Sequence, residues 1–348
     1  MSIFLSRHGA VDGTGIDAGV ASHYGDPHRE QVLLAEGLAA VDLSHRGVIT
    51  IAGADRLTWL HSLTTQHLNG LTPHTSTESL ILTPKGKVEH ALHIVDDGEK
   101  TWITTEPGAA APIVEWLDTM RFMLRVELED VSGAYAVLGE PIGLESVPGE
   151  PVAWVDPWPR LVGDTFAYGP PVEEHPAQGW QWRELIVPVA DVEAALGDRP
   201  LSGTWASEAL RVAAWRPRAG VDTDERAIPH ELDWLRTAVH LHKGCYRGQE
   251  TVARVKNLGR PPRRLVFLHL DGSGHVLPDP GTELLPVEGG RAVGHLTSVA
   301  RHHEDGPIAL ALIKRNTDPE MVLLAEHTSA AQTVIVPSDT ERRPRRVL

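Results

Sequence analysis

Cysteine is almost missing from this chain, because Cys245 is the one cysteine among 348 residues. A lone cysteine excludes an intramolecular disulfide framework, which is the usual support of small secreted domains. The chain is therefore expected to fold without disulfides, in a reducing compartment such as the cytoplasm.

Long apolar runs are absent as well. No uninterrupted apolar stretch approaches the roughly 18 residues that a membrane helix needs, so no membrane partner is expected. The first eight residues contain no cationic leader followed by an apolar run, so no signal peptide is predicted. With 41% hydrophobic and 23% charged residues, the composition is that of an ordinary folded protein, and we predict a cytoplasmic location.

Positive charge is scarce. Lysine and arginine number 32 against 47 aspartates and glutamates, which gives a formal net charge of −15. Proteins that bind nucleic acid without sequence preference neutralise phosphates with cations, so no nucleic-acid partner is expected. The basic tail at residues 341–348 is interpreted as a solvated chain end.

Several chemical signatures are missing. The chain has no glycine-rich phosphate loop, no G-x-S-x-G elbow and no H-E-x-x-H motif, so the common nucleotide-binding and hydrolase templates are unsupported. Its nineteen histidines are scattered along the sequence. His302 and His303 have no neighbours in sequence to complete a site, and we expect them on the surface.

Residues 1–260 combine helical and strand patterns, which indicates an α+β or α/β region. We predict helices at residues 33–43, 54–67, 109–122, 192–196 and 207–215, the last one capped by Ser207. Strands are predicted at residues 48–53, 79–82, 88–95, 101–105, 126–130, 135–138 and 186–189. Glycine and proline are frequent at residues 139–171, which mark a boundary between two subdomains that can be discontinuous.

Residues 261–348 differ from the rest. Gly259, Pro261 and Pro262 stop a preceding helix, and we place a domain boundary there. Short strands separated by glycine, proline and aspartate turns follow, which predicts a small antiparallel barrel or sandwich. They are expected at residues 265–270, 282–285, 291–299, 309–313, 321–324 and 333–336.

The most informative segment surrounds the cysteine. Lys243 and Arg247 flank Cys245 at two residues on either side, and residues 249–257 have the pattern of a helix. Cations and a helix N-terminus both favour the thiolate, so Cys245 is a candidate reactive residue. The alternative is that it is a small buried hydrophobic residue, which is common for free cysteines. The flanking charges argue against this.

Two metal-binding interpretations are weak. His240, His242 and Cys245 have an H-x-H-x-x-C spacing, but a structural zinc site needs a fourth ligand, and Lys243 adds unfavourable charge. Asp222, Asp224 and Glu225 lack the glycine-centred spacing of a calcium loop and are predicted to form a turn. No metal ligands are therefore assigned.

The octapeptide from Lys243 to Glu250 reads K-G-C-Y-R-G-Q-E. It is similar to the K-G-C-Y-x-G-Q-E motif of the YgfZ family, folate-binding proteins related to the glycine-cleavage aminomethyltransferase, or T-protein. Weaker similarities span most of the chain. Residues 42–47 resemble the D-L-S-x-x-G segment of both families, and residues 210–212, 220–222 and 228–229 resemble their L-R…G-x-D…P run.

This resemblance implies an α+β, aminomethyltransferase-like fold of three lobes: a body of two α/β lobes and a C-terminal antiparallel β-barrel. Tetrahydrofolate or a one-carbon derivative is expected in a central cavity, with the cysteine loop near its mouth. The implied partners are iron–sulfur enzymes or their assembly factors. The motif assigns to the functional loop Lys243, Gly244, Cys245, Tyr246, Gly248, Gln249 and Glu250, and Arg247 is added to the site for its charge beside the thiol. The predicted cofactor contacts are Glu89, Arg211, Asp222, Tyr246 and Arg254.

Residue chemistry suggests a role for each part of the loop. Cys245 would be the redox-active or transiently ligating thiol, with Lys243 and Arg247 favouring its thiolate. Tyr246 could pack on an aromatic ligand. Glu250 could fix the loop through Arg254, four residues further along a helix.

The chain also departs from the transferase pattern. Ala213 stands where the transferase motif L-R-L-E-A-G has a glutamate suited to the pterin edge, and Glu89 followed by His90 replaces an acidic pair. Three hypotheses remain open at this point. The chain is a YgfZ-type protein that aids iron–sulfur enzymes, a true folate-dependent aminomethyltransferase, or a folate-binding scaffold without a role for Cys245. The missing acids argue against the second, and the charged cysteine loop argues against the third.

Overall fold

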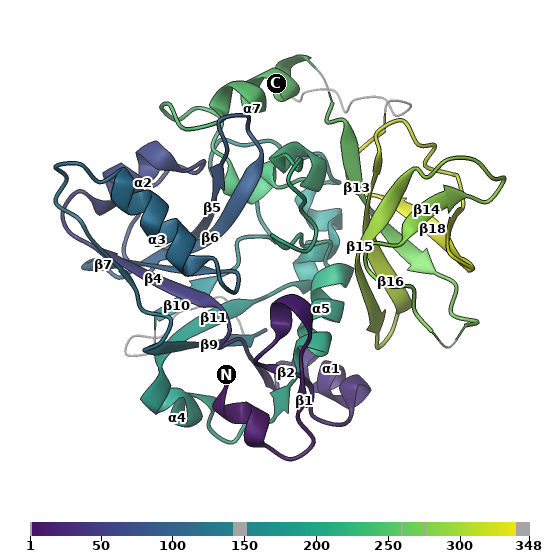
Figure 1. The fold of residues 1–348 in the computed structure, drawn as a ribbon, viewed down its shortest axis with the longest axis horizontal. Helices are drawn as coiled ribbons and strands as arrows, with labels where there is room; N and C mark the ends of the chain where they lie inside the picture. The colour runs from purple at the N-terminus through teal and green to yellow at the C-terminus, as the bar shows by residue number, and fades with distance from the viewer. Residues whose placement is uncertain (1, 142–151, 259, 275, 339–348) are drawn as a thin grey trace.

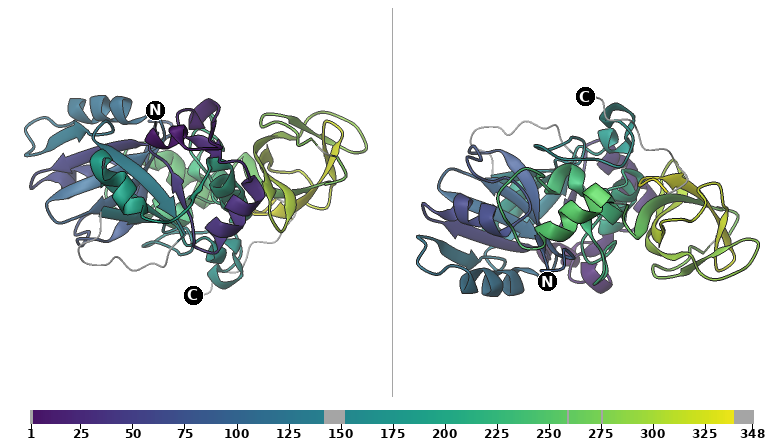
Figure 2. Two further views of the ribbon diagram at one scale, coloured as in Figure 1. Left: turned by 90° about the horizontal axis from the view of Figure 1, so that it is seen from below. Right: turned by 90° about the horizontal axis from the view of Figure 1, so that it is seen from above.

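The structure is a computed structural model that describes residues 2–141, 152–258, 260–274 and 276–338. Its strands form two five-stranded sheets, a closed six-stranded barrel and a two-stranded ribbon of β1 (Val11–Asp12) and β2 (Ala21–His23). Figure 1 shows the barrel at the right of a body that contains both sheets, and Figure 2 shows it standing to one side in two further views. Within the described ranges, no helix has both the length and the apolar character needed to cross a bilayer.

The first sheet is antiparallel throughout and carries two helices, α2 (Arg56–Leu63) and α3 (Ala110–Thr119). Ile49, Ile103 and Leu92 of the sheet share one apolar core with Leu60 and Ile113 of the helices. The strands, in spatial order, are β5 (Ser76–Leu82), β6 (Val88–Asp96), β7 (Lys100–Thr105), β4 (Gly47–Ala52) and β8 (Glu127–Asp130). All of these elements were predicted, with ends that differ by a few residues.

The second sheet is mixed, because its last two strands run parallel. Helix α1 (Pro27–Ala35) packs against α5 (Thr204–Ala213) beside this sheet, and α4 (Val192–Leu196) has the predicted bounds. The strands are, in order, β10 (Val152–Val155), β11 (Arg183–Pro188), β9 (Tyr135–Glu140), β3 (Ala40–Asp42) and β12 (Leu201–Ser202).

Two local predictions are wrong here. The helix expected at residues 33–43 ends at Ala35, Gly37 follows with a φ of 73°, and residues 40–42 form β3. Pairing of β3 with β9 and β12 overrides the helix propensity of alanine and leucine. Ser207 is not a cap, because α5 begins at Thr204 and the Ser207 hydroxyl donates to the Thr204 carbonyl inside the helix.

The C-terminal strands close into an antiparallel barrel, which decides between the two predicted architectures. Phe267, Leu310 and Leu312 on its outer face join the core of the body, next to Val212 and Trp215. The barrel strands are β13 (Arg263–Leu270), β14 (Glu283–Pro286), β15 (Gly294–His302), β16 (Gly306–Lys314), β17 (Leu323–Ala325) and β18 (Thr328–Val334).

The predicted mixture of an α/β body and a barrel is thus confirmed. The division into residues 1–260 and 261–348, with an inner boundary at 139–171, stays a prediction. Residues 142–151 of that boundary and the basic tail at 341–348 lie outside the described residues.

Candidate functional site

The cysteine loop lies between the short helix α6 (Leu235–Ala238) and α7 (Gln249–Leu258), and Lys243 fastens it to the first lobe. The buried ammonium of Lys243 donates to the carbonyls of His61, Thr64 and Gln66, at 3.1 Å for Gln66. The first two carbonyls belong to the C-terminal end of α2, where unpaired carbonyls attract a cation. Burial lowers the pKa of Lys243 to about 8, so the ammonium form still predominates at neutral pH.

The next contacts pack the loop against the body. The Tyr246 ring is buried, and the Lys243 ammonium lies 5.0 Å from its centroid, a cation–π distance. Gly248 has a φ of 83° and lies against the turn between β5 and β6, where a Cβ would come within 2.7 Å of the Thr83 carbonyl oxygen. Gly86 in that turn faces Thr251 equally closely. The two glycines therefore let two backbones touch.

Arg247 and Glu250 form separate ion pairs. Arg247 pairs with Glu89 at 3.0 Å, and its guanidinium lies 5.4 Å from the centroid of Trp116 in α3. Glu250 and Arg254 form the predicted pair at 2.9 Å, on the exposed face of α7. Lys243 and Arg247 thus have partners other than the thiol, and their predicted influence on Cys245 stays a prediction.

Cys245 itself is exposed and free. The alternative that it fills an apolar core is therefore wrong. The structure brings Lys243, Tyr246 and Arg247 together with Glu89 as anchors of the loop, and Gln249 starts α7 with its backbone N–H donating to the Tyr246 carbonyl. The loop is held on several sides and presents the thiol to solvent.

The histidines near the loop do not assemble around the thiol. The rings of His61 and His67 are 4.7 Å apart, and those of His67 and His240 are 5.2 Å apart. His242 instead pairs with Asp164. Across the described ranges, no group of three or more histidine, cysteine, aspartate or glutamate side chains could hold a metal ion.

Arg211 and Asp222, two predicted cofactor contacts, form a buried junction between body and barrel. Arg211 pairs with Asp222 at 2.7 Å and donates to Ser298 of β15. The other Asp222 oxygen accepts from the hydroxyls of Thr297 and Ser298, at 2.5 and 2.7 Å. Asp222 is completely buried, so its carboxylate is committed to this junction.

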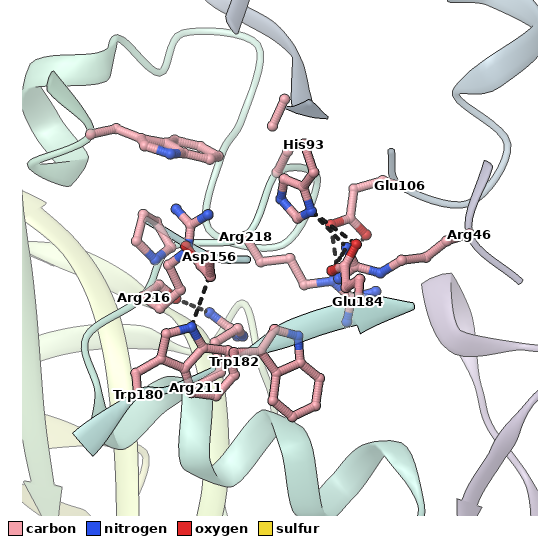
Figure 3. Close-up of a pocket in the computed structure, with 14 residues that line it drawn as sticks. Arg46, His93, Glu106, Asp156, Trp180, Trp182, Glu184, Arg211, Arg216 and Arg218 are labelled. Carbon is pink, nitrogen blue, oxygen red and sulfur yellow. Dashed lines mark hydrogen bonds and ion pairs between the residues drawn. The ribbon is translucent and has the colours of Figure 1, made fainter. Parts of the chain in front are cut away.

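A central cavity lies among Arg46, which precedes β4, the strands β6 and β11, and the segment that follows α5 (Figure 3). Glu184 accepts from Arg46 at 2.7 Å and from the Thr104 hydroxyl at 2.5 Å, and it lies 3.2 Å from His93. Although burial opposes ionisation, Arg46 and His93 hold the pKa of Glu184 well below its usual range. The residues lining the cavity include Arg46, His93, Glu106, Asp156, Trp180, Trp182, Glu184, Arg211, Arg216, Arg218 and Trp234.

The opposite wall of the cavity carries a similar set of ion pairs. Asp156 accepts from the Trp180 indole at 2.8 Å and from Arg216 at 3.0 Å, and burial raises the pKa of Asp156. Arg216 also pairs with Glu78 at 2.7 Å. In each wall the carboxylates thus pair with arginine.

The cavity has a volume of about 30 Å³, which is room for water only. Ligand pockets usually measure about 300–1,000 Å³. Carboxylates, arginines and indoles would suit a pterin chemically, but a folate does not fit among these side chains as they stand. The residues of the loop, all of them described, are not among those that line the cavity.

Sequence reasoning missed the cavity residues apart from Arg211. They come from segments separated by more than a hundred positions, such as Arg46 and Glu184, and no local motif joins them. The one available signal was the polar face of an alternating strand, to which His93 belongs.

Comparisons with known proteins agree with the resemblance drawn from the octapeptide. No protein-family model matches the chain. An aminomethyltransferase from Moorella thermoacetica is 28% identical over 299 residues, 79% of this chain and 78% of that protein. The tRNA-modifying protein YgfZ of Vibrio vulnificus is 26% identical over 294 residues, 81% of this chain and 86% of that protein.

Among solved structures, the glycine cleavage system aminomethyltransferase T from Bartonella henselae superimposes with a TM-score of 0.73. The alignment covers 95% of this chain and 94% of that one, at 17% identity, and shows the fold. The predicted aminomethyltransferase-like fold and the similarity to YgfZ and T-protein chains are thus confirmed.

Proposed function

We propose that this chain is a folate-binding protein of the YgfZ type that supports the assembly or repair of iron–sulfur clusters through Cys245. The observation that carries the proposal is an exposed thiol on an anchored loop. Similarity to YgfZ over 81% of the chain supports it. The sulfur is the group that meets the partner, an iron–sulfur enzyme or an assembly factor.

Each anchor restricts the position of the thiol. Lys243 ties the loop to the end of α2, Tyr246 fills the space beneath that ammonium, and Arg247 holds the other side to Glu89. A loop fixed in this way loses little conformational entropy when a partner binds, which favours binding. These residues position Cys245 and are not assigned a chemical step.

The folate-type ligand is proposed from the resemblance to aminomethyltransferases. The central cavity does not accommodate this ligand as it stands. We propose that Glu89, Arg211, Asp222, Tyr246 and Arg254 contact it. We also propose that the protein is cytoplasmic and that it has no membrane or nucleic-acid partner. The YgfZ relative is named for tRNA modification, whereas the net charge of −15 argues against binding of nucleic acid without sequence preference by this chain.

The alternative is a folate-dependent aminomethyltransferase, which the 28% identity to the Moorella enzyme favours. Ala213 and the Glu89–His90 pair argue against it, because the glutamate of the first transferase motif is missing and the acidic pair of the second keeps one carboxylate, that of Glu89. A non-catalytic folate-binding scaffold is the third possibility, in which Cys245 has no role.

The test is Cys245→Ala in the native host, followed by assays of several iron–sulfur enzymes. We expect a selective loss of some of these activities at unchanged protein level. Ser329→Ala, which truncates an equally small exposed side chain on the barrel, is the control. Full activity of all assayed enzymes under oxidative stress in the Cys245→Ala strain rejects the proposal. Formation of methylene-tetrahydrofolate from an aminomethyl donor would instead support the transferase.

A further inference from the structure

A second, larger hollow lies outside the central cavity, between the body and the barrel. It has a volume of about 520 Å³, within the usual range for small-molecule pockets. Its walls are α1, the end of α5, the 3-10 turn η4 (Pro176–Gly179) and the turn between β15 and β16. We call it the outer groove. Val32, Leu210, Ala213 and Ala214 give it an apolar floor.

His303 presents a hydrogen-bond acceptor to this groove. The Gln31 amide nitrogen donates to the Arg301 carbonyl at 3.1 Å, so its oxygen is the atom that faces His303. That oxygen accepts from the His303 backbone N–H at 2.6 Å and lies 2.9 Å from Nδ1. An amide oxygen only accepts, so Nδ1 carries the proton and the neutral ring keeps a lone pair on Nε2.

His302 presents the opposite group. Its Nδ1 accepts from the backbone N–H groups of Glu304 and Asp305, at 3.3 and 3.1 Å. The exposed Asp305 carboxylate lies 3.3 Å from the same nitrogen, but backbone N–H groups can only donate. The proton of the neutral ring therefore sits on Nε2. The two rings, with centroids 4.4 Å apart, offer one donor and one acceptor side by side.

The remaining walls restrict the ligand further. The Trp180 indole separates the groove from the central cavity and is fixed by its hydrogen bond to Asp156. The charged residues of the lining are Glu36 and Glu304, and no lysine or arginine lines the groove in the described part of the chain. A flat ligand without a phosphate suits an indole wall and an acidic rim.

We propose that the outer groove binds a planar fused heterocycle through a lactam edge, in which a ring N–H stands beside a carbonyl. The carbonyl accepts from Nε2 of His302, and the ring N–H donates to Nε2 of His303. Two sources carry this chemistry, the pterin of a folate and a free purine base. The pterin arm shares the folate-type ligand of the proposed function, but the groove does not include Cys245, so the role of the thiol and binding in the groove are tested by separate measurements.

The test is isothermal titration of the full chain with hypoxanthine and, separately, with 5-formyltetrahydrofolate. His303→Phe keeps the size of the ring and removes the acceptor, and we expect affinity to fall at least tenfold. Ala213→Phe fills the floor and leaves both histidines unsubstituted, and the same loss is expected. His327→Phe, at an exposed turn of the barrel, is the matched control and should bind like the parent.

The pattern of results shows whether the groove binds a pterin or a free purine base. Binding of hypoxanthine alone assigns the groove to free bases, whereas binding of the folate that both groove variants weaken assigns it to pterins. Inosine monophosphate should bind several-fold more weakly than hypoxanthine because its phosphate meets the acidic rim. Lack of saturation by either probe, or binding that both variants leave unchanged, overturns the proposal. Cys245→Ala should bind as the parent does.

Discussion

The central cavity and the cysteine loop use charge in opposite ways. Around the cavity, arginines meet carboxylates from other segments, and the volume left is about 30 Å³. In the loop, Lys243 meets backbone carbonyls, and the thiol is left exposed. The cavity network joins distant segments of the chain, whereas the loop uses its cation to hold an exposed thiol in place. The conspicuous charged cluster is therefore architectural, and the single exposed cysteine is the better candidate for chemistry.

The largest effect is expected from breaking the cavity network. Arg216→Met removes the cation that pairs with the two buried carboxyl groups of Glu78 and Asp156. An uncompensated buried charge costs about 3–5 kcal/mol, so the free energy of unfolding should fall by about that amount. Urea denaturation at neutral pH measures it.

The matched control is Arg226→Met, which breaks an exposed pair with Asp224 at 3.5 Å and should cost less than about 1 kcal/mol. Equal losses in the two variants would show that the cavity network contributes no more than a surface pair, and the contrast between cavity and loop would then be wrong.

Acid should weaken the support of the loop. His230 is completely buried beside α7, where its Nε2 lies 3.1 Å from the Val252 carbonyl, and burial lowers the pKa of His230 to about 4. Between pH 6.5 and 4 the unfolded chain binds a proton that the native chain does not. Stability should therefore fall with falling pH over this window, by up to roughly 3 kcal/mol from this residue.

His230→Gln keeps a donor for Val252 and cannot take up that proton. Between pH 6.5 and 4, its free energy of unfolding should change less with pH than that of the parent. The difference in slope should correspond to at most one bound proton. Thermal unfolding at several pH values measures the slope, and identical slopes would remove His230 from the account.

The smallest effect concerns the loop cation. Lys243→Met deletes the donors to the carbonyls at the end of α2 and should lower the free energy of unfolding by about 2 kcal/mol. Lys314→Met is the control, because Lys314 donates to one exposed carbonyl, that of Ala292, at 2.8 Å. At alkaline pH, where the thiolate predominates in both proteins, alkylation of Cys245 should become faster in Lys243→Met as the loop loosens. An unchanged rate and unchanged stability would show that the loop does not depend on this anchor.

Much of the fold could be predicted from the sequence because the patterns that indicate it are local. Alternation in β6, helical spacing in α7 and the turn residues of the barrel each lie within about ten positions. The helix expected at 33–43 failed because residues 40–42 gain more from pairing in a sheet than their own propensities reveal. His302 was expected on the surface and is largely buried, since the packing of Gln31 on α1 against β15 cannot be read from the His-His pair.

By itself, the sequence determined that Cys245 stands alone, between two cations and before a helix, in a mixed body followed by an all-β end. Covalent neighbours and short-range periodicity are sufficient for such statements. Only the tertiary structure decided what the cations do: Lys243 caps α2, Arg247 pairs with Glu89, and the thiol is left in solvent. The partners of a charged side chain depend on which distant segments fold against it, and burial then makes those partners obligatory.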